Sequence, residues 1–261
     1  MTDLSRLASL LDDAARTATA IPQLSASESI SVDDAYEIQR LSIELRIERG
    51  ERLVGLKLGF TSKAKMIQMG VDDMIWGRLT DQMTIIEGGS IGLGGYVHPR
   101  IEPEIAFLMA SPLRGEVTSE EALNAVEAVA PAMEIIDSRY EAFKFNLADV
   151  VADNCSSSGY VIGTWQKPSV DIANLDMRLD FDGEAVQAGS SAAILGDPLE
   201  SLVNAARLAD SAGFGLEPGW ILLAGAATAA EALRPGIQVR AVVESLGTVE
   251  VSVTSQNGED Q

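Results

Sequence analysis

The sequence predicts an α+β fold, with helices at the front and a largely β core behind them. Three observations support this: two helical patterns open the chain, two hairpin signals lie in its last third, and the remaining helices are scattered. The length of 261 residues suits one large domain or a core with an appended lobe. We expect a mainly helical N-terminal lobe over residues 1–80 and a β-rich catalytic domain over residues 81–261.

The front of the chain predicts two helices. Residues 3–18 form an amphipathic pattern with four leucines on one side. A second helix is expected to begin after Ser31, which can cap it, and to end before Gly50. Asp33 and Asp34 fall in its first turn, where carboxylates favour the positive end of the helix dipole.

The middle of the chain mixes strands with one helix. The expected elements are a glycine-punctuated strand at Leu53–Gly59, a glycine-rich loop at Gly88–Gly95, a strand at His98–Met109, a helix at Ser119–Val129 and a strand at Ala132–Asp137.

The last third predicts two hairpins around one helix. The first hairpin spans Arg178–Ala188 and turns at Asp182-Gly183, a strong local hairpin signal. The helix opens at Asp197, which can cap it, with proline at the first helical position. The second hairpin spans Ile237–Val253.

Composition excludes several functions. Lys plus Arg number 19 and Asp plus Glu number 39, so the net charge is 19 − 39 = −20, which argues against nucleic acid as a partner. One histidine, His98, and one cysteine, Cys155, cannot form a Cys/His zinc site or an intramolecular disulfide. Any metal site must therefore consist mainly of carboxylates, which select hard cations such as Mg²⁺ or Mn²⁺.

The sequence predicts a cytoplasmic protein without a membrane segment. The first residues lack the basic start and apolar run of a secretory signal. The longest charge-free apolar stretch near the C-terminus, Pro218–Ala230, is shorter than the roughly 20 residues that a membrane span needs. We expect Cys155 to remain a thiol.

The sharpest chemical feature is Glu102-Pro103-Glu104 within an apolar strand. Residues two apart on a strand share a face, so the two carboxylates converge. Such a pair resists ionisation unless a cation compensates it. The spacing alone also allows an edge strand with a solvated acidic face.

Glu134 lies in similar surroundings in the next predicted strand. Together with Glu102 and Glu104 it can supply three oxygens to an octahedral cation, which leaves positions for water or substrate. Asp137 has the opposite parity on a regular strand, so we expect it to pair with Arg139 instead.

Lys57 lies in an apolar strand bounded by glycines. A partly buried lysine needs an anionic partner or a lowered pKa. A lysine at a strand edge that extends to water is an equally good interpretation. The polar run from Asp153 to Ser158 can line a pocket, but a loop with local hydrogen bonds is the more ordinary structure.

The assembled motifs are similar to the hydratase/decarboxylase branch of the fumarylacetoacetate hydrolase superfamily. The resemblance covers nearly the whole chain. Its matching stretches are GLKLGFTSKAKMIQMGV at 55–71, HPRIEPEIAF at 98–107, MEIIDSRYEAFKF at 133–145, DVVADNCSS at 149–157 and AAILGDP at 192–198.

The resemblance implies a mixed β-roll or barrel core and a metal, Mg²⁺ with Mn²⁺ as an alternative, held by Glu102, Glu104 and Glu134. It also implies that Lys57 faces the substrate as the catalytic residue. The residues expected to bind substrate are Gly59, Ile75, Leu79, Asp81, Arg139, Ser157 and Thr228.

Two activities of this branch are candidates, both in meta-cleavage pathways of aromatic degradation. One is decarboxylation of 2-oxo-3-hexenedioate, also called 4-oxalocrotonate, and the other is hydration of 2-hydroxypenta-2,4-dienoate. Hydratases of the branch typically have an acid where this chain has Ile75, and decarboxylases typically have isoleucine, so the resemblance favours decarboxylation. Met74, Trp76 and the segment from Ala224 to Thr228 depart from the usual pattern.

Three other interpretations remain open at this point. A hydratase would add water without releasing CO₂. A hydrolase of acylpyruvate type would need a histidine-containing dyad, for which only His98 is present. A non-catalytic subunit of a hydratase complex would not require the three glutamates and Lys57. We expect a 2-oxo dicarboxylate substrate, a homo-oligomer and a possible complex with a pathway hydratase.

Overall fold

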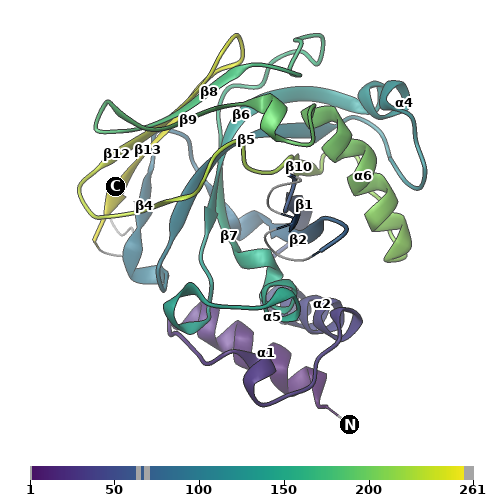
Figure 1. Ribbon diagram of the computed structural model, residues 1–261, viewed down its shortest axis with the longest axis vertical. Coiled ribbons are helices and arrows are strands. Elements are labelled where there is room, and N and C mark those ends of the chain that lie inside the picture. The colour runs from purple at the N-terminus through teal and green to yellow at the C-terminus, as the bar shows by residue number, and fades with distance from the viewer. Residues whose placement is uncertain (1, 63–65, 68–70, 256–261) are drawn as a thin grey trace.

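A computed structural model of the protein describes residues 2–62, 66–67 and 71–255. Some helices gather at one end, others lie beside the strands, and two β-sheets form most of the remainder, which confirms the α+β prediction (Figure 1). Parts of the 55–71 motif and the final six residues lie outside the described ranges. Within those ranges, no helix is long and apolar enough to cross a membrane.

The helical lobe consists of α1 (Leu4–Arg16), α2 (Val32–Glu48) and the short α5 (Leu147–Ala152), which pack together at the lower end of Figure 1. The Ser31 and Asp34 side chains form a reciprocal capping box at the start of α2. Buried side chains of all three helices, with Leu7 and Ile38 among the largest, form the core of the lobe.

The larger sheet has eight strands, in the order β2-β1-β10-β5-β6-β7-β3 with β11 also pairing with β5. Its strands are β1 (Leu53–Gly59), β2 (Ile75–Thr80), β3 (Thr84–Ile85), β5 (Arg100–Met109), β6 (Val126–Ile136), β7 (Ser157–Ile162), β10 (Ile221–Leu223) and β11 (Glu231–Ala232). The sheet curls until β2 contacts β7, and a hydrogen bond of 2.6 Å joins Thr84 to the Tyr160 hydroxyl. One face of the sheet is therefore enclosed by the curl.

The smaller sheet has five strands in the order β4-β13-β12-β8-β9. They are β4 (Ser90–Gly92), β8 (Asp176–Phe181), β9 (Glu184–Ser190), β12 (Gln238–Val243) and β13 (Gly247–Thr254). This sheet packs against β5, β6 and β7 through an apolar layer that includes Met133, Val161 and Val251. Both predicted hairpins are confirmed, and the first turns at Asp182 and Gly183, whose positive φ values fit a tight hairpin turn.

Helices α4 (Ser119–Asn124) and α6 (Pro198–Ser211) cover another part of the outer face of the larger sheet. Asp197 caps α6 as predicted, because its side chain accepts the N–H of Leu199 at 2.9 Å. Leu202 and Phe107 belong to the buried apolar layer between α6 and the sheet.

Two sequence predictions differ from the structure. The helix expected over 119–129 ends at Asn124, and β6 begins at Val126, since this segment pairs with β5 along its whole length. Tertiary pairing has overridden the local helical preference of an Ala- and Glu-rich segment. The helical part of the N-terminal region is also shorter than residues 1–80, because β1 and β2 already belong to the larger sheet.

The lobe core provides a test of the packing on α1. Leu11 is 2% exposed, whereas its neighbour Leu10 is 39% exposed. We expect Leu11→Ala to lower the free energy of unfolding by about 2–5 kcal/mol, because it leaves a cavity. Leu10→Ala on the same helix is the matched control, with an expected change of about 0.5 kcal/mol or less. Urea denaturation measures both, and equal effects would contradict this packing.

Candidate metal centre and active site

The candidate site lies on the enclosed face of the larger sheet. Residues that pair directly across neighbouring strands point to the same side, so the strand registers define this face. Lys57 aligns with Leu223, which aligns with Ala106, and Ala106 shares its face with Glu104 and Glu102. Lys57 on β1 and the two glutamates on β5 therefore face the same interior.

The three predicted metal ligands meet in this interior. Glu102 on β5 is the direct cross-strand partner of Glu134 on β6, and Glu104 is two residues further along β5. One carboxylate oxygen from each lies within 4.8 Å of the others. Glu104 and Glu134 are fully buried. The alternation that predicted a shared face for Glu102 and Glu104 is confirmed, and the solvated-edge interpretation is wrong for Glu104.

Lys57 reaches the cluster from β1 across the curl. Its Nζ lies 2.7 Å from Glu134 Oε2 and 3.4 Å from the carbonyl oxygen of Cys155. The side chain is 4% exposed, so a lysine that extends to water is excluded. With all groups ionised, three carboxylates and one ammonium carry a net charge of −2, which a divalent cation would balance.

Burial and mutual repulsion govern the ionisation of this cluster. Burial, then the charges of Glu134 and Glu102, raise the pKa of Glu104 well above its ordinary value. Burial also raises the pKa of Glu134, although Lys57 and Ser157 oppose the shift. Burial lowers the pKa of Lys57, but the three glutamates outweigh it and the net shift is upward. The contact with Glu134 thus favours the charged form of Lys57.

The residues present fit a hard divalent cation. Glu104 Oε2 accepts the N–H of Gly225 at 2.8 Å, whereas its buried Oε1 has no hydrogen-bond partner in the part of the chain that the structure describes. A buried carboxylate oxygen without a donor is costly unless a cation occupies the position. Three carboxylates in an interior without histidine or thiolate ligands favour Mg²⁺ or Mn²⁺ over softer metals.

Gly225 is a part of the site that sequence reasoning did not identify. It follows β10 with φ +107°, and a Cβ added there would lie 2.2 Å from Thr61 Oγ1. Only glycine fits this conformation and this approach. Gly225 lies in the segment from Ala224 to Thr228, which departs from the usual family pattern. That departure was the signal in the sequence that could have indicated this position.

The remaining predicted substrate residues fall into two groups. Gly59 and Ile75 pair in the β1–β2 register and share the enclosed face with Leu79, while Ser157 donates a hydrogen bond of 2.7 Å to Glu134. The other three are engaged elsewhere. Asp81 forms an ion pair with Arg52, and Arg139 forms a buried ion pair with Asp153. The Thr228 hydroxyl donates a hydrogen bond to the Ala229 carbonyl.

The expected pairing of the Asp137 carboxylate with Arg139 is wrong, because the Arg139 guanidinium donates to the backbone carbonyl of Asp137 instead. The Asp137 carboxylate accepts the N–H groups of Val97 and His98 at 2.8 and 2.7 Å. Arg139 instead binds Asp153 through its Nε and its backbone N–H. The strand ends before Asp137, so its side chain turns to the neighbouring backbone.

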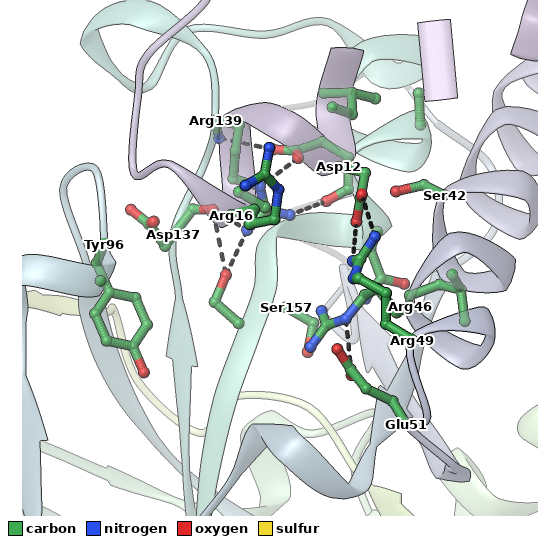
Figure 2. Close-up of a pocket in the computed structure, with 18 residues that line it drawn as sticks. Asp12, Arg16, Ser42, Arg46, Arg49, Glu51, Tyr96, Asp137, Arg139 and Ser157 are labelled. Carbon is green, nitrogen blue, oxygen red and sulfur yellow. Dashed lines mark hydrogen bonds and ion pairs between the residues drawn. The ribbon is translucent and has the colours of Figure 1, made fainter. Parts of the chain in front are cut away.

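A cavity of about 340 Å³ lies between the helical lobe and the start of β7 (Figure 2). Its lining contains four arginines, Arg16, Arg46, Arg49 and Arg139, and four carboxylates, Asp12, Glu51, Asp137 and Asp153. Arg49 donates two hydrogen bonds to the Asp12 carboxylate, and Arg46 Nε lies 2.9 Å from Glu51 Oε2. The four positive and four negative side chains cancel, so the cavity is not a net cationic pocket.

Residues 61–254 match the fumarylacetoacetate (FAA) hydrolase C-terminal family, so the chain belongs to that family. It is 60% identical over 253 residues to a 4-oxalocrotonate decarboxylase from a Pseudomonas species, covering 97% of this chain and 99% of that protein. It is 37% identical to a 2-keto-4-pentenoate hydratase from Paraburkholderia xenovorans, covering 87% of this chain and 85% of that protein.

A solved structure is also similar to the whole fold. It is the 4-oxalocrotonate decarboxylase from Pseudomonas putida G7, complexed with magnesium and adipate. The TM-score is 0.93 at 34% identity, covering 96% of this chain and 97% of that one. The predicted membership in the hydratase/decarboxylase branch is confirmed.

Glu104→Gln tests the metal centre. The amide keeps the size of the side chain but loses an anionic ligand, so we expect Mn²⁺ affinity to fall by more than the roughly 10–100-fold that loss of an outer-shell partner costs. Calorimetric titration of metal-free protein measures this. Glu127→Gln, on an exposed part of β6, is the matched control and should bind normally. Equal affinity for Mn²⁺ in wild type and Glu104→Gln would refute the site.

The raised carboxyl pKa values predict a pH dependence of stability. The stabilisation linked to Glu104 and Glu134 is fully present below their unfolded pKa of about 4.3 and is lost as pH rises through the folded values. Metal-free protein should therefore become less stable toward alkaline pH. We expect Mg²⁺ to raise the melting temperature more at about pH 8 than at about pH 5.5, because only ionised carboxylates bind it. A shift independent of pH would contradict this explanation.

Proposed function

We propose that this protein is a divalent-cation-dependent carboxy-lyase that converts 2-oxo-3-hexenedioate to 2-hydroxypenta-2,4-dienoate and CO₂. The proposal rests on the cluster of three glutamates with Lys57, on the decarboxylase that is 60% identical, and on the similar fold of a solved decarboxylase structure. The substrate is a dianion, so a site that binds it must supply positive charge.

Glu102, Glu104 and Glu134 would hold the cation, with Mg²⁺ as the proposed ion and Mn²⁺ as an alternative. When bound, the cation supplies Lewis-acid stabilisation of negative charge on the keto oxygen of the substrate. Lys57 supplies a second positive charge that the protein itself carries. Its contacts with Glu134 and the Cys155 carbonyl fix the position of the ammonium before substrate arrives, which favours electrostatic catalysis.

The reaction needs little proton transfer at carbon. The bond from C5 to the departing carboxylate breaks, CO₂ leaves, and the electron pair moves through the alkene to the keto oxygen. One proton from solvent then converts the enolate oxygen to the hydroxyl of 2-hydroxypenta-2,4-dienoate, which keeps its C1 carboxylate. The residue that faces the departing carboxylate therefore does not need to be an acid or a base, and an apolar environment favours the loss of charge.

The identity and position of Ile75 favour decarboxylation over hydration. Ile75 pairs with Gly59 on β1 and shares the enclosed face with Lys57. It is only 5% exposed, in an apolar environment. An acid suited to proton transfer during hydration is absent at this position. The relatives named hydratases are less similar to this chain than the decarboxylase is.

Gly59, Leu79 and Ser157 are the further substrate contacts that we propose, since they share the enclosed face or touch Glu134. Asp81, Thr228 and Arg139 contact Arg52, Ala229 and Asp153 respectively, and these contacts do not support a role in binding the substrate. A homo-oligomer and a complex with a pathway hydratase remain predictions, as does a location in the cytoplasm.

Release of CO₂ tests the proposed function directly. Metal-stripped protein is supplied with Mg²⁺ and 2-oxo-3-hexenedioate, and CO₂ is measured against substrate consumed. We expect one CO₂ for each substrate molecule and no reaction with a chelator present. Water addition to 2-hydroxypenta-2,4-dienoate without any CO₂ release from the hexenedioate would instead identify a hydratase.

Lys57→Met tests the role of the ammonium group. It removes a charge that stabilises the transition state, so we expect kcat to fall by about 10²–10³-fold. Lys167→Met changes the same residue type at an exposed position and should leave kcat unaltered. Circular dichroism confirms that both variants are folded. Full activity in folded Lys57→Met would remove this lysine from the mechanism.

A further inference from the structure

The segment that joins α5 to β7 has an unusual backbone. Asn154, Cys155 and Ser156 follow one another with φ values of 48°, 53° and 61°. Residues with a side chain rarely adopt this left-handed region, and only asparagine of the three tolerates it readily. Such a conformation persists only where the surrounding structure holds it, and it is commonest at functional sites.

Asn154 holds this turn against strand β2. Its Oδ1 accepts the N–H of Arg78 at 2.7 Å, and its Nδ2 donates to the carbonyl of the same residue at 2.9 Å. One side chain thus satisfies both backbone groups of Arg78, as a neighbouring strand would. Gly77 permits the approach, because a Cβ added there would lie 2.6 Å from the Asn154 carbonyl oxygen.

This turn and the residue after it contact both members of the ion pair between Lys57 and Glu134. The Cys155 carbonyl accepts from Lys57 Nζ at 3.4 Å, and Ser157 donates to Glu134 at 2.7 Å. The Cys155 thiol points away from these groups, since it donates to the Trp76 carbonyl. The path of the backbone therefore determines where the carbonyl that faces Lys57 lies.

We propose that Asn154 is a positioning residue for the reaction: its two-point contact with Arg78 holds the left-handed turn that fixes Lys57 beside Glu134. The inference rests on the proposed function for its kinetic consequence, but its structural consequence is independent of the substrate. Loss of the contact lets the turn relax to an ordinary backbone conformation. The Cys155 carbonyl then leaves Lys57, while β5, β6 and Gly225 continue to hold the carboxylates.

Asn154→Ala tests the proposal, with Asn146→Ala as the matched control. The Asn146 side chain accepts the Asp149 N–H at 2.9 Å and caps the start of α5, at the end of that helix opposite to the turn. A misplacement of about 1 Å can cost about 10²-fold in rate, so we expect kcat of Asn154→Ala to fall by that order. Mn²⁺ affinity should be retained, and Asn146→Ala should lose thermal stability without losing kcat.

A merely structural role predicts a different result. Asn154→Ala would then resemble Asn146→Ala, with a lower melting temperature and a wild-type kcat at a temperature where the protein is folded. That result overturns the proposal. Asn154→Asp keeps the acceptor for the Arg78 N–H and tolerates a positive φ, so we expect it to restore part of kcat. If Asn154→Ala does not fold, Asn154→Asp decides, and an unaltered kcat overturns the proposal.

Crystal structures separate this inference from the proposed function. If wild type releases no CO₂, the proposed function fails, yet the position of Lys57 can still be compared between wild type and Asn154→Ala. We expect Lys57 Nζ to have left the Cys155 carbonyl and the turn to have lost its left-handed φ values. An unchanged turn and an unchanged Lys57 in that variant would refute the positioning role.

Discussion

The contact between Lys57 and Glu134 is the interaction on which the rest of the site depends. Three carboxylates in the interior of a curled sheet cannot all remain ionised without positive charge nearby. Lys57 supplies one such charge, 2.7 Å from Glu134, and a divalent cation would balance the remaining two. Removal of one partner of a buried pair typically costs about 3–5 kcal/mol. The same arrangement prepares an anion-binding interior in a protein whose net charge is −20.

The fold supports this contact from two directions. The carboxylates belong to the long paired strands β5 and β6, whereas Lys57 and its carbonyl partner come from β1 and from the turn after α5. Left-handed residues in that turn cost roughly 1–2 kcal/mol each. Gln39 of α2 connects the two segments that hold the turn, since its amide donates to the carbonyls of Trp76 on β2 and Val151 on α5. The helical lobe thus helps to hold the turn whose carbonyl contacts Lys57.

Sequence reasoning predicted the parts of the site that follow from strand periodicity. Glu102 and Glu104 share a face because they are two apart, and Glu134 joins them through β5–β6 pairing. The partners of Arg139, the role of Asn154 and the donor at Gly225 depend on contacts between distant segments, which local pattern does not encode. The helix expected over 119–129 failed for the same reason: its second half is a paired strand.

The location of the cation tests the central claim most directly. Crystals grown with Mn²⁺ can be measured at the manganese absorption edge, where an anomalous difference peak marks the ion. We expect one strong peak among the carboxylate oxygens of Glu102, Glu104 and Glu134, with Lys57 still in contact with Glu134. A strong peak elsewhere, or none there at saturating Mn²⁺, would contradict it.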